Sequence, residues 1–238
     1  MPLADDMTAM NEPATTRFDF ERIASRYDAW YRTDRGAMYD LLEKRAIDGL
    51  LPAASRDSKL LEVGCGTGHF SDHFAGRGFE VTGIDISEPM IARARQENIT
   101  NSTFELANAE RLPFADETFD VAAAITALEF VSDPANAVSE MARSVKKPGG
   151  TLIFGVLNRL CAYNQDRKRR AASVYASASL FSPDDLRHLL KPYGTVTILV
   201  AGFVPRRDAF VWLSPLLERI ERLTGNQHGA FLAAKVVL

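Results

Sequence analysis

The sequence predicts an open α/β fold, in which helices cover both faces of a parallel sheet. From Lys59 onward, short apolar runs alternate with helical segments, and this alternation is typical of βαβ units. The first run leads straight into a glycine-rich turn, and the second ends at Asp85. Open parallel sheets bind ligands outside the carboxyl ends of their strands. Both features therefore predict a binding site at that edge of the sheet.

The N-terminal part is expected to form a tail followed by a helical cap. Residues 1–16 lack apolar periodicity, which predicts a loose tail. Aromatic residues at mixed helical spacing predict one or two short helices over 18–31, and Met38–Leu50 has the pattern of an amphipathic helix. We assign residues 17–52 to this cap, within a single domain that spans 17–238.

The strands and helices of the sheet region follow from the same alternation. The apolar runs predict seven strands: Lys59–Val63, Glu80–Ile84, Thr103–Leu106, Phe119–Ile125, Thr151–Val156, Thr195–Val200 and Phe231–Val237. Helices are predicted at His69–Arg77, Pro89–Glu97, Pro134–Val145 and Leu186–Leu190. Asp133 caps the third helix and Ser182 begins the fourth. Residues 156–181 and 201–229 remain as long insertions, which are commonly functional.

Composition excludes several classes of protein. Of the 238 residues, 46% are hydrophobic and 25% are charged, with a net charge of −3, which argues against disorder and against a dedicated nucleic-acid binder. Cys65 and Cys161 are isolated, so no disulfide framework or zinc site is predicted. The acidic start is unlike a signal peptide, and the uncharged stretch 192–205 is too short to span a membrane. We expect a cytoplasmic protein without a membrane partner.

The glycine-rich turn is the strongest single signal. Gly64, Gly66 and Gly68 separate the first strand from a helix. Glycines there permit positive φ and let a ligand approach the backbone, while the helix N-terminus offers unpaired N–H groups. Asp85, at the end of the second strand, can accept hydrogen bonds from both hydroxyls of a ribose. Together these residues predict a ligand that contains adenosine.

The details of the turn favour a nucleoside with an amino-acid tail. The spacing is G-x-G-x-G, followed by His69, whereas a dinucleotide fingerprint requires G-x-G-x-x-G. Glu62, two residues before the first glycine, is unfavourable beside a diphosphate but suits an amino group. The phosphate-binding pattern G-x-x-x-x-G-K-[ST] is absent from the sequence.

Several ordered motifs now identify a resemblance. The turn at Glu62–Gly68, Asp85, Asn108–Phe114, Phe119-Asp120 and Lys146–Gly150 resemble those of class I S-adenosylmethionine-dependent methyltransferases. The similarity covers roughly residues 17–157 and is greatest to the small-molecule branch of ubiquinone and menaquinone biosynthesis. It implies a Rossmann-like sheet of seven mostly parallel strands in the order 3-2-1-4-5-7-6, with the last strand antiparallel.

The resemblance also implies roles for individual residues. Glu62 and the glycines would surround the methionine part of S-adenosylmethionine, Asp85 would bind the ribose, and Thr126 would face the sulfonium. Ile86 and Met90 would lie at the adenine face, Asn108 and Ala109 at its edge, and Tyr27 over the carboxylate end. The full set of expected cofactor-binding residues is Tyr27, Glu62, Gly64, Cys65, Gly66, Gly68, Asp85, Ile86, Met90, Asn108, Ala109, Glu110 and Thr126. Relatives often have Asp where Asn108 stands, and an Asn carbonyl can still accept a hydrogen bond.

Methyl transfer needs little chemistry from the protein, because the cofactor carries its own leaving group. Two candidates for a general base are Glu129, which follows the fourth strand, and His228, which precedes the last strand. Glu129 has an alternative interpretation as the partner of an arginine or a backbone amide. His69 and His73 lie one helical turn apart without a third ligand, so no metal is predicted.

The expected acceptor is a small molecule. Thr126-Ala-Leu-Glu129 stands where nucleic-acid amino methylases have [DN]-P-P-[YFW]. Apolar residues could roof a pocket, but they could equally form core or a dimer contact: Trp30, Tyr31, Tyr175, Phe203, Phe210, Val211, Trp212, Leu213, Leu216, Leu217 and Ile220. Residues 161–191 carry a net charge of +3, centred on Arg167–Arg170, which could steer an anionic molecule or RNA or be a solvated face.

Other interpretations remain open from the sequence. The chain could bind the cofactor without catalysis, or be an RNA methyltransferase or an NAD-type oxidoreductase. The protein could be a monomer or a homodimer.

Overall fold

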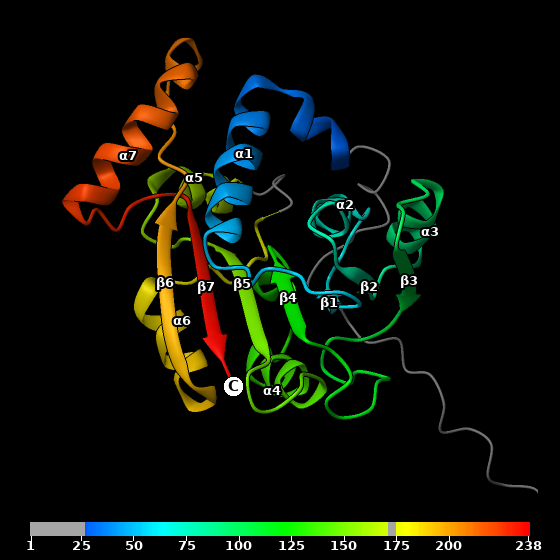
Figure 1. Cartoon of the computed structure of the whole chain (residues 1–238). Coiled ribbons are helices and arrows are strands. Elements are labelled where there is room, and N and C mark those ends of the chain that lie inside the picture. Colours follow the sequence, from blue (N-terminus) through cyan, green and yellow to red (C-terminus); the bar gives the residue numbers. More distant parts are fainter. Residues whose placement is uncertain (1–26, 171–174) are drawn as a thin grey trace, which may run out of the picture.

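The computed structural model describes residues 27–170 and 175–238, which form a single sheet with helices on both faces (Figure 1). The expected tail at 1–16 and the start of the cap lie outside the described residues. The strands are β1 (Lys59–Val63), β2 (Glu80–Asp85), β3 (Ser102–Leu106), β4 (Val121–Ile125), β5 (Thr151–Leu157), β6 (Thr195–Ala201) and β7 (Phe231–Val237). Their spatial order is β3-β2-β1-β4-β5-β7-β6.

The sheet topology confirms the predicted fold class. β1 pairs in parallel with β2 and β4, whereas β7 runs antiparallel to both β5 and β6. The carboxyl ends of β1, β2, β4 and β5 therefore share one edge, and the start of β7 joins them because Phe231 pairs with Leu157. This edge collects the residues that the sequence singled out.

The helices are interspersed with short 3-10 turns. They are η1 (Tyr27–Arg32), α1 (Asp34–Asp48), α2 (His69–Gly76), α3 (Glu88–Gln96), η2 (Leu128–Phe130), α4 (Pro134–Ser144), α5 (Ala162–Arg169), α6 (Pro183–Leu190), η3 (Lys191–Tyr193), η4 (Asp208–Leu213) and α7 (Ser214–Thr224). None of the helices in the described ranges is long and apolar enough to cross a membrane.

Alternating strand residues build two cores, one on each face of the sheet. Leu60 and Ala123 pack with α1 and α2 on one face, where Ile47 and Phe74 are fully buried. Leu61 and Ala124 point the other way, toward α4 and α6. Successive side chains of a strand point to opposite faces of the sheet. When both faces are buried, the strand sequence is a continuous apolar run, as in Val121–Ile125.

Two capping predictions are confirmed. The Asp133 side chain accepts from Asn136 N–H at the start of α4. Ser182 and Asp185 form a reciprocal capping box at the start of α6. Such caps satisfy N–H groups that have no partner inside the helix.

Both insertions contain helices that the sequence pattern did not predict. α5 is highly polar, and of its side chains only Asn164 is buried. α7 projects from the end of the sheet beside β6 in Figure 1. Most apolar positions of α7 and η4 are exposed, although Val211 is buried and Leu213 and Leu217 are half-buried; the exposed ones are Phe210, Trp212, Leu216, Ile220 and Leu223. These exposed residues are not core residues.

Candidate active site

The glycine turn is built from three positions with different tasks. Gly64, Gly66 and Gly68 have φ of +74°, +54° and +89°. A Cβ on Gly64 would lie 2.4 Å from Ala127 Cβ, and one on Gly68 would lie 2.8 Å from the Ile99 side chain. A Cβ on Gly66 would meet nothing within 4 Å. Two glycines therefore permit close packing, and the third leaves open space in front of the backbone.

Asp85 is held against this turn. Its carboxylate is 7% exposed and accepts hydrogen bonds from Gly66 N–H and Ser87 N–H, both at 2.9 Å. Burial raises the pKa of this carboxyl, and the N–H groups of Ser87 and Gly66 oppose the rise. Each oxygen keeps a second lone pair, so the group can still accept from two hydroxyls.

Glu62 is a buried acid behind the turn. It lies on β1, and Ser71 of α2 donates a hydrogen bond to it. Burial raises its pKa to about 8, and the charge of Asp85 adds to the rise. A carboxyl in this position favours a proton or a cationic ligand.

Three other predicted residues differ in how deeply they are buried. The Cys65 thiol, whose pKa burial raises, packs beside Ile91 and Phe104. Met90 is fully buried in the first turn of α3, and Ile86 is half-buried just after β2.

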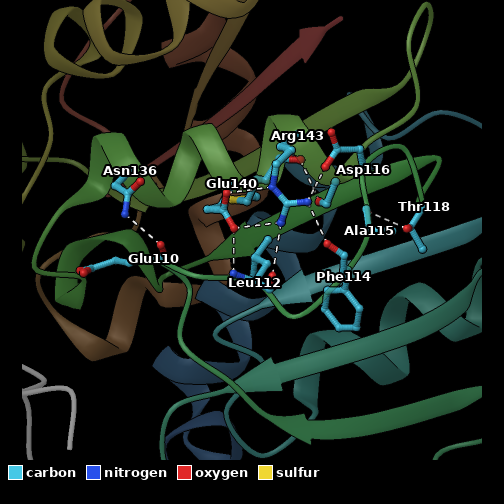
Figure 2. A network of polar contacts seen from close by, with 11 residues as sticks. Glu110, Leu112, Phe114, Ala115, Asp116, Thr118, Asn136, Glu140 and Arg143 are labelled. Atoms are coloured by element: carbon cyan, nitrogen blue, oxygen red, sulfur yellow. Dashed lines mark hydrogen bonds and ion pairs between the residues drawn. The ribbon is translucent and has the colours of Figure 1, made fainter. Parts of the chain in front are cut away.

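The loop after β3 is fixed by an arginine from α4 (Figure 2). Arg143 donates to the carbonyls of Leu112 (3.2 Å) and Phe114 (2.8 Å), and it pairs with Glu140 and Asp116. The Leu112 N–H in turn donates to Glu140 at 2.9 Å. This network immobilises the loop that carries the predicted adenine-edge residues.

Asn108, Ala109 and Glu110 lie at the start of that loop. The Asn108 side-chain oxygen accepts from Glu110 N–H at 2.9 Å, which makes a local turn. Glu110 accepts from Asp133 N–H at 2.8 Å, and its carbonyl accepts from the Asn136 side chain at 2.8 Å. The latter bond is visible in Figure 2. Glu110 thus ties the loop to the start of α4.

The N-terminal cap is joined to the glycine turn from the other side. Thr67 donates to Asp28 of η1 at 2.7 Å. The Tyr31 ring stacks on His69, with 3.9 Å between ring centres, and His69 also bonds to Asp40 of α1 at 2.6 Å. Tyr27 begins η1, but its side chain lies outside the described residues.

The two histidines of α2 therefore both bond to α1. His73, one turn after His69 on α2, contacts Asp48 at 2.8 Å, whereas His69 contacts Asp40. Within the described ranges, no group of three or more His, Cys, Asp or Glu side chains is arranged to hold a metal ion.

The segment after β4 has an unusual backbone and a buried acid. Thr126 has φ of +49°, and its N–H donates to Gly155 at 2.7 Å. Glu129 is fully buried; one carboxylate oxygen accepts from Leu157 N–H at 2.5 Å. Its other oxygen has no hydrogen-bond partner in the described part of the chain. Burial raises the pKa of Glu129 to about 7.

His228, unlike this acid, is at the surface. It is exposed in the loop between α7 and β7, and its ring bonds to Asn226 at 2.9 Å. The loop reaches the carboxyl edge of the sheet because β7 begins there.

A cluster beside Glu129 was only partly predicted from the sequence. Arg167 of α5 is surrounded by the rings of Trp30, Tyr163 and Tyr175, and Glu43 of α1 lies close enough for its charge to interact with that of Arg167. The sequence indicated Trp30 and Tyr175 as possible pocket residues and 167–170 as a basic run, but it did not distinguish Arg167 from its neighbours or indicate Glu43 and Tyr163.

Comparison with known proteins is consistent with this geometry. The methyltransferase domain family matches residues 61–154. A malonyl-[acyl-carrier protein] O-methyltransferase of Salmonella typhimurium is 30% identical over 87% of this chain and 76% of its own length. A ubiquinone biosynthesis O-methyltransferase of Hydrogenovibrio crunogenus is 38% identical over 74% of this chain and 73% of its own. A solved S-adenosylmethionine-dependent methyltransferase of Thermotoga maritima superposes with a TM-score of 0.70 at 26% identity, covering 92% of this chain and 97% of that one.

Proposed function

This chain belongs to the class I S-adenosylmethionine-dependent methyltransferases, and from that premise we propose that it methylates a small molecule at the carboxyl edge of β1 and β4. One observation carries the location: Gly66 leaves open space in front of a turn whose backbone is bonded to the buried carboxyl of Asp85, with the buried carboxyl of Glu62 behind it.

The residues at this edge fit S-adenosylmethionine. A Cβ on Gly66 would project into the open space in front of the turn, so the absence of a side chain leaves room for a ligand. Glu62 supplies a buried carboxyl for an amino group, and Asp85 supplies lone pairs for hydroxyls. One acid, Glu62, suits a cationic amino group, and the other, Asp85, suits the two hydroxyls of a ribose. A nucleoside with an amino-acid tail carries both of these groups.

We assign the cofactor contacts accordingly. Glu62 and the glycine turn would hold the methionine part, Asp85 the ribose, and Ile86 one face of the adenine. Asn108 and Ala109 would meet the adenine edge, in a loop that Arg143 immobilises. Thr126, held in a left-handed conformation at the end of β4, would face the sulfonium.

When bound, the cofactor supplies an activated methyl group with a neutral leaving group. The protein's part is to align the acceptor and to exclude water. Glu129 is our candidate for the proton acceptor: one oxygen is fixed by Leu157 N–H, and the other is unpartnered in the described residues. A carboxyl with a pKa of about 7 can take a proton at neutral pH. His228 is a second candidate from the same edge.

A transfer assay tests this proposal. The purified protein is incubated with methyl-labelled S-adenosylmethionine and a panel of small carboxylic acids, phenols and amines. We expect label in at least one acceptor, with one S-adenosylhomocysteine formed per methyl group. Glu129→Gln should lower kcat by about 100-fold if Glu129 acts as the base, with cofactor affinity unchanged.

Other outcomes of the assay would select an alternative. Cofactor binding without transfer to any acceptor would favour a non-catalytic binding module. Binding of RNA that weakens steeply with salt and is lost when Arg167–Arg170 are neutralised would favour an RNA methyltransferase. Binding of NAD in place of S-adenosylhomocysteine would contradict the cofactor assignment.

A further inference from the structure

Arg167 occupies an aromatic environment at the end of α5. Its guanidinium carbon lies 3.6 Å from the Tyr175 ring centre, 5.4 Å from Tyr163 and 5.5 Å from Trp30. Tyr163 also stacks on Tyr39 of α1, with 5.6 Å between ring centres. Rings from η1, α5 and the segment after α5 thus converge on one cation. Stacking of this kind orients a guanidinium, and Tyr175 also accepts a side-chain hydrogen bond from Arg167. A guanidinium has five N–H donors, so others remain for a ligand.

Arg167 differs from the other half-buried arginines of the described chain. Arg35 pairs with Asp208 at 2.7 Å, and Arg143 pairs with Asp116 at 2.7 Å. Within the described ranges, no carboxylate lies within ion-pair distance of Arg167, although Arg169, two residues on, pairs with Asp166 at 2.6 Å. Among the residues that the structure describes, the charge of Arg167 is therefore not matched by an anion at contact distance.

The nearest acids do not neutralise this charge near neutral pH. Burial, and next the charge of Asp40, raise the pKa of Glu43 to about 8, while Arg167 opposes the rise. Glu129, whose pKa is about 7, adds to the rise at Glu43. At pH 7 the Glu43 carboxyl is therefore largely protonated, and the Glu129 carboxyl is about half protonated. A protonated carboxyl is neutral. The cluster as a whole is electropositive.

The cluster lies over the segment that follows β4. The Tyr175 ring is 6.1 Å from the ring of Phe130, and Ser179 N–H donates to the Glu129 carbonyl at 2.8 Å. Glu43 belongs to α1, whose Asp40 bonds to His69 just beyond the glycine turn. The cluster is therefore placed beside the proposed transfer site, on the side away from Asp85.

We propose that Arg167 binds an oxyanion group, carboxylate or phosphate, carried by the methyl acceptor. The guanidinium presents a rigid fork of donors that matches two oxygens of such a group. The surrounding rings hold that fork in place and provide apolar surface for the adjoining part of the acceptor. This inference rests on the proposed function, because it describes the acceptor of the same reaction.

Tryptophan fluorescence can test this assignment directly. The chain has two tryptophans, and Trp212 is 71% exposed, so Trp212→Phe leaves Trp30 as the reporter beside Arg167. This variant, saturated with S-adenosylhomocysteine, is titrated with cyclohexanecarboxylate, cyclohexyl phosphate, cyclohexanecarboxamide and cyclohexylamine. We expect at least one anion to bind about tenfold or more tightly than the amide, as charge-assisted hydrogen bonds predict. Which anion binds better distinguishes a carboxylate acceptor from a phosphate acceptor.

Substitutions then assign the preference to one residue. Arg167→Gln should abolish the preference for the anion, Arg167→Lys should keep part of it, and Arg169→Gln on the same helix should leave it unchanged. Calorimetric binding of S-adenosylhomocysteine should be unaffected in all three variants. Equal binding of acid and amide, preference for the amine, saturation by no probe, or an anion preference that survives Arg167→Gln would each contradict the proposal. Failure of the parent protein to bind S-adenosylhomocysteine would instead contradict the proposed function.

Discussion

Asp85 is the residue on which the cofactor assignment depends most. Its carboxylate is already oriented by Gly66 N–H and Ser87 N–H, so ribose hydroxyls would find a fixed acceptor. Asp85→Ala should weaken the binding of S-adenosylhomocysteine by about 2–4 kcal/mol, as expected for the loss of a buried, charged hydrogen-bond partner. Isothermal titration calorimetry measures this change. Asp72→Ala, at an exposed position on α2, is the control and should bind like the wild type.

Glu62 makes a separate prediction about pH. Its pKa is about 8 in the folded protein and near 4.5 when unfolded, so it contributes stability below pH 4.5 that is lost as the pH rises through 8. The wild type should therefore lose more stability between pH 5.5 and 8.5 than Glu62→Gln, by on the order of 2–3 kcal/mol. Urea denaturation at both pH values measures the difference. Parallel pH dependences of the two proteins would contradict the raised pKa.

At the scale of single residues, the sequence predicted those that belong to a local motif. Glu62, the glycines and Asp85 each lie within a strand end or the turn that follows it, so a short window contains the signal. Glu43 carries no such signal, and the basic run at 167–170 does not single out Arg167, because the two residues come together only when α1 and α5 pack over the segment after β4. A contact between segments more than a hundred residues apart cannot be deduced from the spacing within either one.

Among the elements, the glycine turn allows a test with a matched control. Gly66 and Gly149 both have positive φ, +54° and +98°, and a Cβ on either would meet nothing within 4 Å. An alanine at either position should cost about 1 kcal/mol of stability, because an L-residue is strained there. Only Gly66→Ala should also weaken S-adenosylhomocysteine binding, by about 1–3 kcal/mol, since its methyl group would enter the space we assign to the ligand. Equal affinities of the two variants would contradict that placement.

The link between α4 and the loop after β3 is a second prediction for an element. Arg143→Lys keeps the charge but cannot reach both carbonyls and both carboxylates seen in Figure 2. We expect the free energy of unfolding to fall by about 1–3 kcal/mol. Arg93→Ala, which removes ion pairs at the surface with Glu97 and Asp28, should change it by less than about 0.5 kcal/mol. Denaturant titration of the two variants decides whether the network is structural.

Helices and strands were predicted most accurately where their side chains are buried. β1 and β7 were predicted to the residue, because both are largely apolar runs and both lie inside the sheet. The run at Phe119–Ile125 was predicted to be one strand, but Phe119 forms only an isolated bridge to Val145, and β4 begins at Val121. α5 was not predicted as a helix, because its polar sequence has no apolar period to detect.

For the whole molecule, the strand order could not be deduced from the apolar runs alone. Seven strands allow many orders, and the order 3-2-1-4-5-7-6 entered through the resemblance of the ordered motifs. The structure has that order, and the consequence is functional: it brings the ends of β1, β2, β4 and β5 to one edge of the sheet. We expect the insertions to form the substrate side, and one of them contains α5, whose polar sequence has no apolar period.

A crystal structure of the complex with S-adenosylhomocysteine tests the central claim most directly. We predict that the ribose hydroxyls lie within hydrogen-bond distance of Asp85, that the amino group of the ligand lies toward Glu62, and that its sulfur faces the Glu129–Arg167 side of the site. Ligand density elsewhere on the molecule, or at the glycine turn with the ribose turned away from Asp85, would contradict the proposed site.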